Sequence, residues 1–387
     1  MADYAIVSAI DGVQIGLGAV VVLVTLYDVF QSVVMPRPAV GRVRLSVTLG
    51  RQGWRVWRKV AERPRSLQLR EAALAAYAPL AVVALLVLWA FFLILGYALI
   101  YNGLPDGLHP QPASLGATLY FSTGRMLAFP VGGIEATGAA TQTLTSIEAA
   151  SGFGLFALVI SLLFSLFSSF QRRESAVVAL DALAGAPPSG VQLLENCARD
   201  RMPEQLVTTF EEWRLWTVDV LESHLSYPLL FYFRSSHDNE GWPNSFGAVM
   251  DAATLVLSTI ERGPAGPARL MYKVGAHLVT DMRLFYRYAG ELVPGVEREE
   301  FVEACNRLTR AGYQLRPLDK AWEEFSGLRS KYAVWLNVTT KALNVPPAPW
   351  IGDRSYLPHR ERGPRPRSLT RPRQRSAKEP VATRRNP

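Results

Sequence analysis

The residues of this chain that could do chemistry stand in one glycine-bearing stretch, FSTGRMLAFPVGGIEATG, at positions 121–138. It holds Arg125 and Pro130, and long apolar runs flank it on both sides. Irregular backbone at membrane depth is tolerated only where it is buried in protein or lines a water-filled cavity, because its polar groups need partners. The stretch is therefore the first candidate for a functional site.

The sequence contains no recognisable set of catalytic residues. The sequence has neither a phosphate-binding glycine loop nor a Ser/His/Asp set. Two cysteines, Cys197 and Cys305, are too few and too isolated for a disulfide framework or a zinc site. We therefore expect no enzyme activity, no cofactor and no metal site. The five histidines are scattered without metal-ligand spacing: His109, His224, His237, His277 and His359.

Three apolar runs, 10–30, 72–105 and 149–170, are long enough to cross a bilayer. A helix of roughly 20 residues spans the hydrocarbon core of about 30 Å. The first run follows acidic residues, where a cleavable signal peptide would carry positive charge, so it is predicted to be a retained membrane helix. Asp28, near the inner end of this run, is expected to be solvated or paired with an arginine.

Charge predicts the orientation. Residues 37–70 hold ten Lys and Arg against one acid, whereas the loop at 101–111 holds none. Because basic residues mark the cytoplasmic side, we expect a multi-pass protein of the cell inner (plasma) membrane. Its N-terminus would lie outside and its C-terminal region in the cytoplasm.

The predicted fold is an all-α integral membrane protein with five parts. A first transmembrane helix (1–35) is followed by a basic linker (36–71), a pore domain (72–174), an all-helical cytoplasmic domain (175–345) and a disordered basic tail (346–387). Trp54 and Trp57 suit a linker helix that lies in the membrane interface or, equally, one that packs on the cytoplasmic domain. The tail is expected to bind anionic headgroups, at about 1 kcal/mol per basic residue near the surface. Nucleic acid is not an expected partner.

The stretch at 112–126 predicts a short helix. Pro112 and Ser114 suit a helix start, and the apolar pattern continues for three to four turns. A helix of about 12 residues spans roughly 18 Å, half a membrane. Because irregular backbone follows it, we predict a re-entrant pore helix and loop.

The order of basic linker, outer helix, "LYFST", glycine-bearing loop and "EAASGFGLFALVISLLFSLFSSFQRRE" resembles bacterial potassium-channel-like proteins of the two-transmembrane, one-pore-loop superfamily. The similarity covers about residues 27–174. It implies a homotetramer in which the third helix lines a pore for monovalent ions. Gly152 and Gly154 are similar in placement to inner-helix glycines, which close helix packing would equally explain.

The filter departs from the family's T-x-G-[YF]-G-D run. By the resemblance, Ala128 takes the place of the threonine and lacks its hydroxyl, and Pro130 takes the place of the first glycine with a fixed φ. The ladder of carbonyl oxygens that selects potassium is then not expected in its usual shape. The filter-like residues are Ala128, Phe129, Pro130, Val131, Gly132 and Gly133.

Arg125 would add a positive charge near the end of the pore helix. Glu135 or Glu148 could neutralise it, and a structural Arg–Glu pair is the other interpretation. Three functions follow: an ion channel of altered selectivity, a non-conducting membrane scaffold or sensor with the same architecture, and an anion or small-solute pore.

Overall fold

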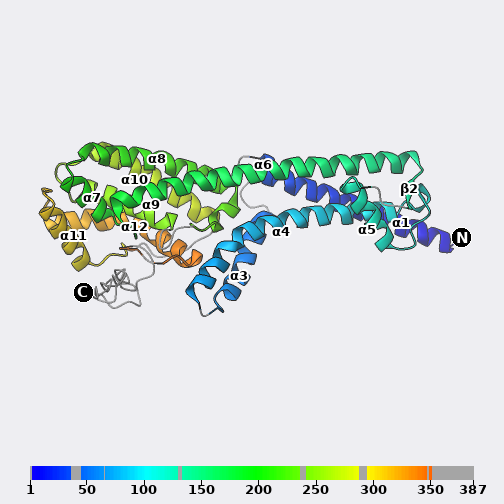
Figure 1. Ribbon diagram of the computed structural model, residues 1–387, viewed down its shortest axis with the longest axis horizontal. Coiled ribbons are helices and arrows are strands. Elements are labelled where there is room, and N and C mark those ends of the chain that lie inside the picture. Colours follow the sequence, from blue (N-terminus) through cyan, green and yellow to red (C-terminus); the bar gives the residue numbers. More distant parts are fainter. Residues whose placement is uncertain are drawn as a thin grey trace, which may run out of the picture.

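The computed structural model describes residues 2–35, 45–64, 66–129, 133–235, 241–286, 294–346 and 348–350. Figure 1 shows an elongated molecule, with long helices at one end and a helical domain at the other. The predicted helical character is confirmed for these residues, apart from two two-residue strands. The tail at 351–387 lies outside the described residues.

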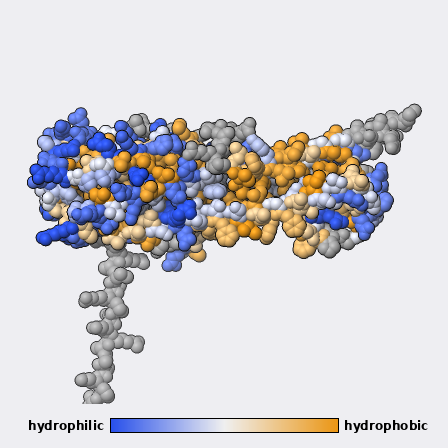
Figure 2. Space-filling model, turned by 90° about the horizontal axis from the view of Figure 1, so that it is seen from above, coloured by the Kyte–Doolittle hydropathy of each residue, from blue (hydrophilic) through white to orange (hydrophobic). Residues whose placement is uncertain are grey.

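Three long helices form the apolar half of the molecule: α1 (Ala2–Val29), α4 (Leu67–Asn102) and α6 (Ala139–Ala184). Each is long and apolar enough to cross a membrane, in the segments Ile10–Val34, Gln68–Asn102 and Ala139–Ala184. The three predicted apolar helices are thus confirmed. Figure 2 shows apolar residues gathered over this half and hydrophilic residues over the other. Three helices of this length and composition fit a membrane protein.

Small residues allow α1 and α4 to approach closely. A Cβ added at Gly18 would lie 2.5 Å from the Gly96 carbonyl oxygen, and one at Gly103 would lie 2.7 Å from that of Asp11. Such contacts replace the hydrophobic driving force that is absent between helices in lipid.

Asp28 differs from its expected surroundings. It is buried, and its carboxylate accepts hydrogen bonds from the Trp89 indole at 2.8 Å and from the Leu45 backbone N–H at 3.1 Å. Buried carboxylates need such donors. The aspartate therefore holds α1 to α4 and to the start of the linker.

The linker contains α2 (Leu45–Thr48), a π-helical turn (Leu49–Gly53) and α3 (Trp54–Ala61). Trp54 donates from its indole to the Ala342 carbonyl at 2.8 Å, and Trp57 donates to that of Ala73 at 2.8 Å. The tryptophans thus face the protein, and Trp54 packs on the C-terminal domain, which was the second interpretation of the sequence.

The C-terminal domain, residues 190–350, is a bundle around the central helix α9 (Trp242–Ser258), whose side chains are almost all buried. At its centre Arg329 pairs with Asp251 at 2.8 Å, and Tyr332 donates to the same carboxylate at 2.7 Å. The other helices are α7 (Gly190–Arg199), α8 (Pro203–Ser226), α10 (Ala265–Tyr286), α11 (Arg298–Arg310) and α12 (Leu318–Leu343), with a 3-10 turn at Pro228–Tyr232.

Helix α6 does not end where the basic residues begin. It continues past the predicted boundary at 174 to Ala184, because Arg173 and Glu174 are buried against the C-terminal domain instead of meeting solvent. One helix thus joins the apolar half to the C-terminal domain without a break (Figure 1).

Candidate functional site

The short helix predicted from the sequence is present as α5 (Leu115–Met126), with 12 residues. Ser114 caps it, since its hydroxyl accepts a hydrogen bond from the Ala117 N–H at 3.3 Å. At 1.5 Å per residue the helix is about 18 Å long.

Helix α5 lies between α4 and α6 at the end of the molecule farthest from the C-terminal domain (Figure 1). Phe121 is fully buried and meets the Tyr101 ring edge-on, with 5.1 Å between ring centroids. The segments before and after α5 are joined by strands β1 (Leu108–His109) and β2 (Glu135–Ala136), which pair antiparallel. Packing and strand pairing together fix both ends of the loop.

A buried carboxylate holds α5 in place. Glu148 on α6 is fully buried and accepts hydrogen bonds from Tyr101 on α4 at 2.8 Å and from Ser122 on α5 at 2.5 Å. Tyr101 and Ser122 each bond a different oxygen of this carboxyl group. One side chain therefore ties together the three elements around the loop.

Arg125 lies on α5, with its guanidinium 4.9 Å from the centroid of the Phe121 ring. It makes no ion pair within 4.0 Å with any residue that the structure describes, and its buried Nε has no hydrogen-bond partner. Its charge nevertheless acts on Glu148 electrostatically, without a direct contact between the two side chains.

The end of α5 reverses the chain direction at Ala128. The N–H of Phe129 donates to the Gly124 carbonyl at 2.8 Å, and that of Ala128 donates to Arg125 at 3.2 Å. With φ of 55° at Ala128, this is a Schellman cap that places alanine where glycine is usual. Ala128 closes the helix, a role that the predicted filter register did not foresee.

The remaining filter-like residues are only partly described. Phe129 is exposed, and Gly133 has φ of 99°, which favours glycine. Pro130, Val131 and Gly132 lie outside the described residues.

The two inner-helix glycines have different surroundings. A Cβ at Gly152 would lie 2.1 Å from the Met126 carbonyl oxygen, so only glycine permits α6 to touch the end of α5. Gly154 has nothing within 4 Å of a Cβ position. Gly152 therefore has a packing role beside the loop, and Gly154 lies on the open face of α6.

Helix α6 is the least covered of the three long helices. In the most apolar 18-residue segment of each helix, 17% of α6 is buried, compared with 28% of the first span and 33% of α4. Exposed apolar residues recur along α6 at intervals of three and four positions, so they form one apolar stripe along the helix. The stripe consists of Phe153, Phe156, Ile160, Phe164 and Phe167.

Residues 228–234, here called the junction segment, hold α6 to the C-terminal domain. Arg173, fully buried on α6, donates to the Phe233 carbonyl at 2.6 Å and to that of Leu230 at 3.1 Å. The same guanidinium pairs with Glu174 at 2.9 Å. Beside it, burial and the charge of Arg173 lower the pKa of His224 to about 3, so the imidazole is neutral.

The junction segment also holds α4. Arg234 pairs with Glu71, near the start of α4, at 2.5 Å and donates to the Leu343 carbonyl of α12 at 2.5 Å. Tyr232 packs against Trp54 and Tyr77 with 5.7 Å between centroids in each case. The junction segment thus contacts two of the three apolar helices, and α6 also packs directly against α7, α8 and α9.

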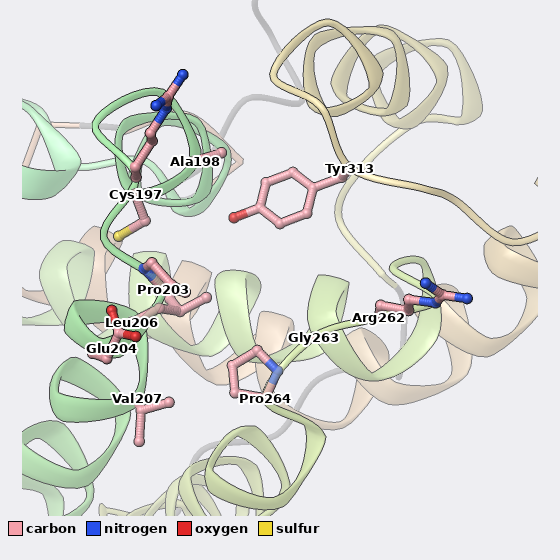
Figure 3. A pocket seen from close by; sticks show the side chains of 11 residues that line it. Cys197, Ala198, Pro203, Glu204, Leu206, Val207, Arg262, Gly263, Pro264 and Tyr313 are labelled. Atoms are coloured by element: carbon pink, nitrogen blue, oxygen red, sulfur yellow. The ribbon is translucent and has the colours of Figure 1, made fainter.

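A separate pocket lies in the C-terminal domain between α7, the start of α8 and Pro264 (Figure 3). Its volume is about 540 Å³. Tyr313 faces it, but the hydroxyl donates to the Leu194 carbonyl at 3.0 Å, and burial raises its pKa to about 12. We assign this pocket no role.

Within the described part of the chain, no group of three or more His, Cys, Asp or Glu residues could hold a metal ion. Comparisons with protein-family models, curated proteins and solved structures give no match. The residues that sequence reasoning missed are Tyr101 and Ser122, whose hydroxyl positions no spacing rule indicates.

Proposed function

We propose that this chain is the subunit of a homotetrameric pore-loop ion channel, in which α5 and residues 127–134 form the re-entrant loop and α6 lines the pore. The observation that carries this proposal is α5 itself. It is a capped helix of half-membrane length, wedged between two helices that are long enough to span, with its end against Gly152. A simple connection between two membrane helices needs no such element.

The open face of α6 supports assembly. One copy leaves Phe153, Phe156 and Phe164 uncovered on the helix that carries Gly154. Cyclic symmetry would bring four such faces and four loops around one axis.

The selectivity differs from that of the potassium-channel-like family. Ala128 ends α5 in a left-handed turn and has no hydroxyl in the place of the family's threonine, so a filter of the family's usual shape is not expected. The buried Glu148 carboxylate offsets the charge of Arg125, which lets cations approach. We therefore propose a channel for monovalent cations with weak discrimination between potassium and sodium.

The proposed orientation follows the positive charge of the linker, with the C-terminal domain in the cytoplasm of a cell whose inner (plasma) membrane holds the protein. The basic tail would then face anionic lipid on the same side.

Ion flux through the purified protein in liposomes tests the function. Potassium and sodium flux of similar size supports the proposal. Chloride flux that is lost in Arg125→Gln supports an anion pore instead. An intact tetramer without flux of any ion would refute conduction and leave the membrane scaffold or sensor.

A further inference from the structure

Helix α3 and the first turns of α4 form a hairpin, residues 54–78, that projects sideways from the long axis of the molecule (Figure 1). It lies beside the junction segment, where the apolar half meets the C-terminal domain, since Tyr77 of the hairpin packs against Tyr232. With a membrane normal along the spanning helices, α3 would lie at the edge of the apolar half that is nearest the C-terminal domain (Figure 1).

One face of the hairpin is committed to the protein. Trp54 buries its ring and donates from its indole N–H to the Ala342 carbonyl at 2.8 Å. The partly buried Trp57 donates to the Ala73 carbonyl at 2.8 Å and so joins the two arms of the hairpin. Tyr77 donates to the Leu49 and Gly50 carbonyls, at 2.9 Å each. The hairpin is therefore anchored rigidly, and its opposite face has a fixed orientation.

The opposite face mixes basic and apolar side chains. Gln52, Arg55, Val56, Lys59 and Val60 follow one another at helical spacing and form one stripe. Val56 is 65% exposed and Val60 46%. Valines beside basic residues on one helix face are typical of helices that lie on a membrane.

We propose that this stripe lies on the membrane surface nearest the C-terminal domain and binds the phosphate groups of anionic phospholipids. Arg55 and Lys59, one turn apart, supply the charge, and Val56 and Val60 enter the headgroup layer between them. The inference rests on the membrane placement in the proposed function and is independent of ion conduction. A second copy of the chain would instead need an acidic, shape-matched surface against this stripe.

Lipid contact can be measured with a fluorescent label on Val56→Cys in the full chain. Both native cysteines are buried, so the new thiol takes the label selectively. A matched label on Leu284→Cys, at an exposed position of the C-terminal domain, is the control. Spin-labelled phosphatidylcholine in the vesicle should quench the first label and not the second. Equal quenching at the two positions would overturn the proposal, as would self-quenching between copies at position 56.

The preference for anionic lipid is measured as the ratio of quenching by spin-labelled phosphatidylglycerol to that by spin-labelled phosphatidylcholine at position 56. Arg55→Gln with Lys59→Gln should lower the relative binding of phosphatidylglycerol at least about fivefold. Arg269→Gln with Lys273→Gln removes an equally spaced exposed pair from α10 and should leave the ratio unchanged. A ratio of one in the unaltered chain would refute anionic recognition even if quenching occurs. Loss of ion flux alone would leave these results standing and refute only the channel.

Discussion

Single residues at the end of α5 determine how the loop begins. Ala128 occupies a left-handed position at a Schellman cap, where the absence of a Cβ would relieve strain. The cost of a non-glycine residue there is about 1–2 kcal/mol. An alanine kept under this strain fixes the direction of the backbone that follows.

The change Ala128→Gly should therefore stabilise the protein by up to about 1 kcal/mol, less the extra freedom that glycine gives the unfolded chain. Thermal unfolding of the purified protein in detergent measures the effect. Ala117→Gly, within the same helix, is the control and should destabilise by a similar amount. A lower melting temperature for Ala128→Gly would contradict the strain at this position.

Glu148 and Arg125 should control charge selectivity together. In Glu148→Gln the charge of Arg125 is no longer offset, so the ratio of cation to anion permeability should fall about tenfold. One charge acting over about 10 Å at an effective dielectric constant of 20 is worth about 1.7 kcal/mol. The double change Glu148→Gln with Arg125→Gln should restore the ratio, which reversal potentials in bilayers measure. Ser122→Ala, which removes a hydrogen bond but no charge, should leave it near its original value.

At the loop, the sequence predicted the contacts between neighbouring residues but not those between residues far apart in the chain. Ser114 and the length of α5 were predictable because a cap and a helix are set by neighbouring residues. The Glu148 cluster was not, because Tyr101 and Ser122 stand 47 and 26 positions away along the chain. The left-handed Ala128 was missed because an alanine carries no signal for that conformation, whereas glycine would have.

At the scale of elements, the junction segment and α6 behave as one unit. The buried Arg173 satisfies two carbonyls of the junction segment and the Glu174 carboxylate, so three partners depend on it. The predicted pore domain ended at 174, beside this arginine. The burial of Arg173 was not predictable from its neighbours, because its partners in the junction segment stand about 60 positions further along the chain.

Removing this arginine should loosen the C-terminal domain from α6. Arg173→Met leaves Glu174 unpaired in a buried place, and breaking a buried pair costs about 3–5 kcal/mol. Limited proteolysis of the full chain should show faster cleavage near residue 233 than in the unaltered protein. Arg173→Met with Glu174→Gln should recover part of the protection. Arg172→Met breaks only an exposed pair with Asp219 and should speed cleavage much less than Arg173→Met does.

His224 predicts a pH dependence for the same unit. Its folded pKa of about 3 lies below the ordinary value of 6.5, so the unfolded chain binds the proton first. Its contribution to stability is complete above pH 6.5 and falls by about 1.4 kcal/mol per pH unit from there toward pH 3. His224→Gln should flatten this slope in urea unfolding between pH 7 and 5. The exposed His277→Gln should retain it, and identical slopes in both variants would exclude His224 as its source.

For the whole molecule, composition alone indicated the division into an apolar half and a polar domain, and three of the long helices follow from it. What composition does not contain is how the halves join. The sequence predicted that the pore domain ends at 174, because charged residues become frequent after that position. The helix itself continues to Ala184.

The unbroken α6 has a mechanical consequence. Its 46 residues make a rod about 69 Å long, on which the buried Arg173 and Gly152, pressed against the end of α5, stand about 32 Å apart. A tilt of only about 5° at the C-terminal domain would move the helix at Gly152 by about 3 Å. The helix is thus a lever arm, and the tight contact at Gly152 is the point where its movement would press on the loop.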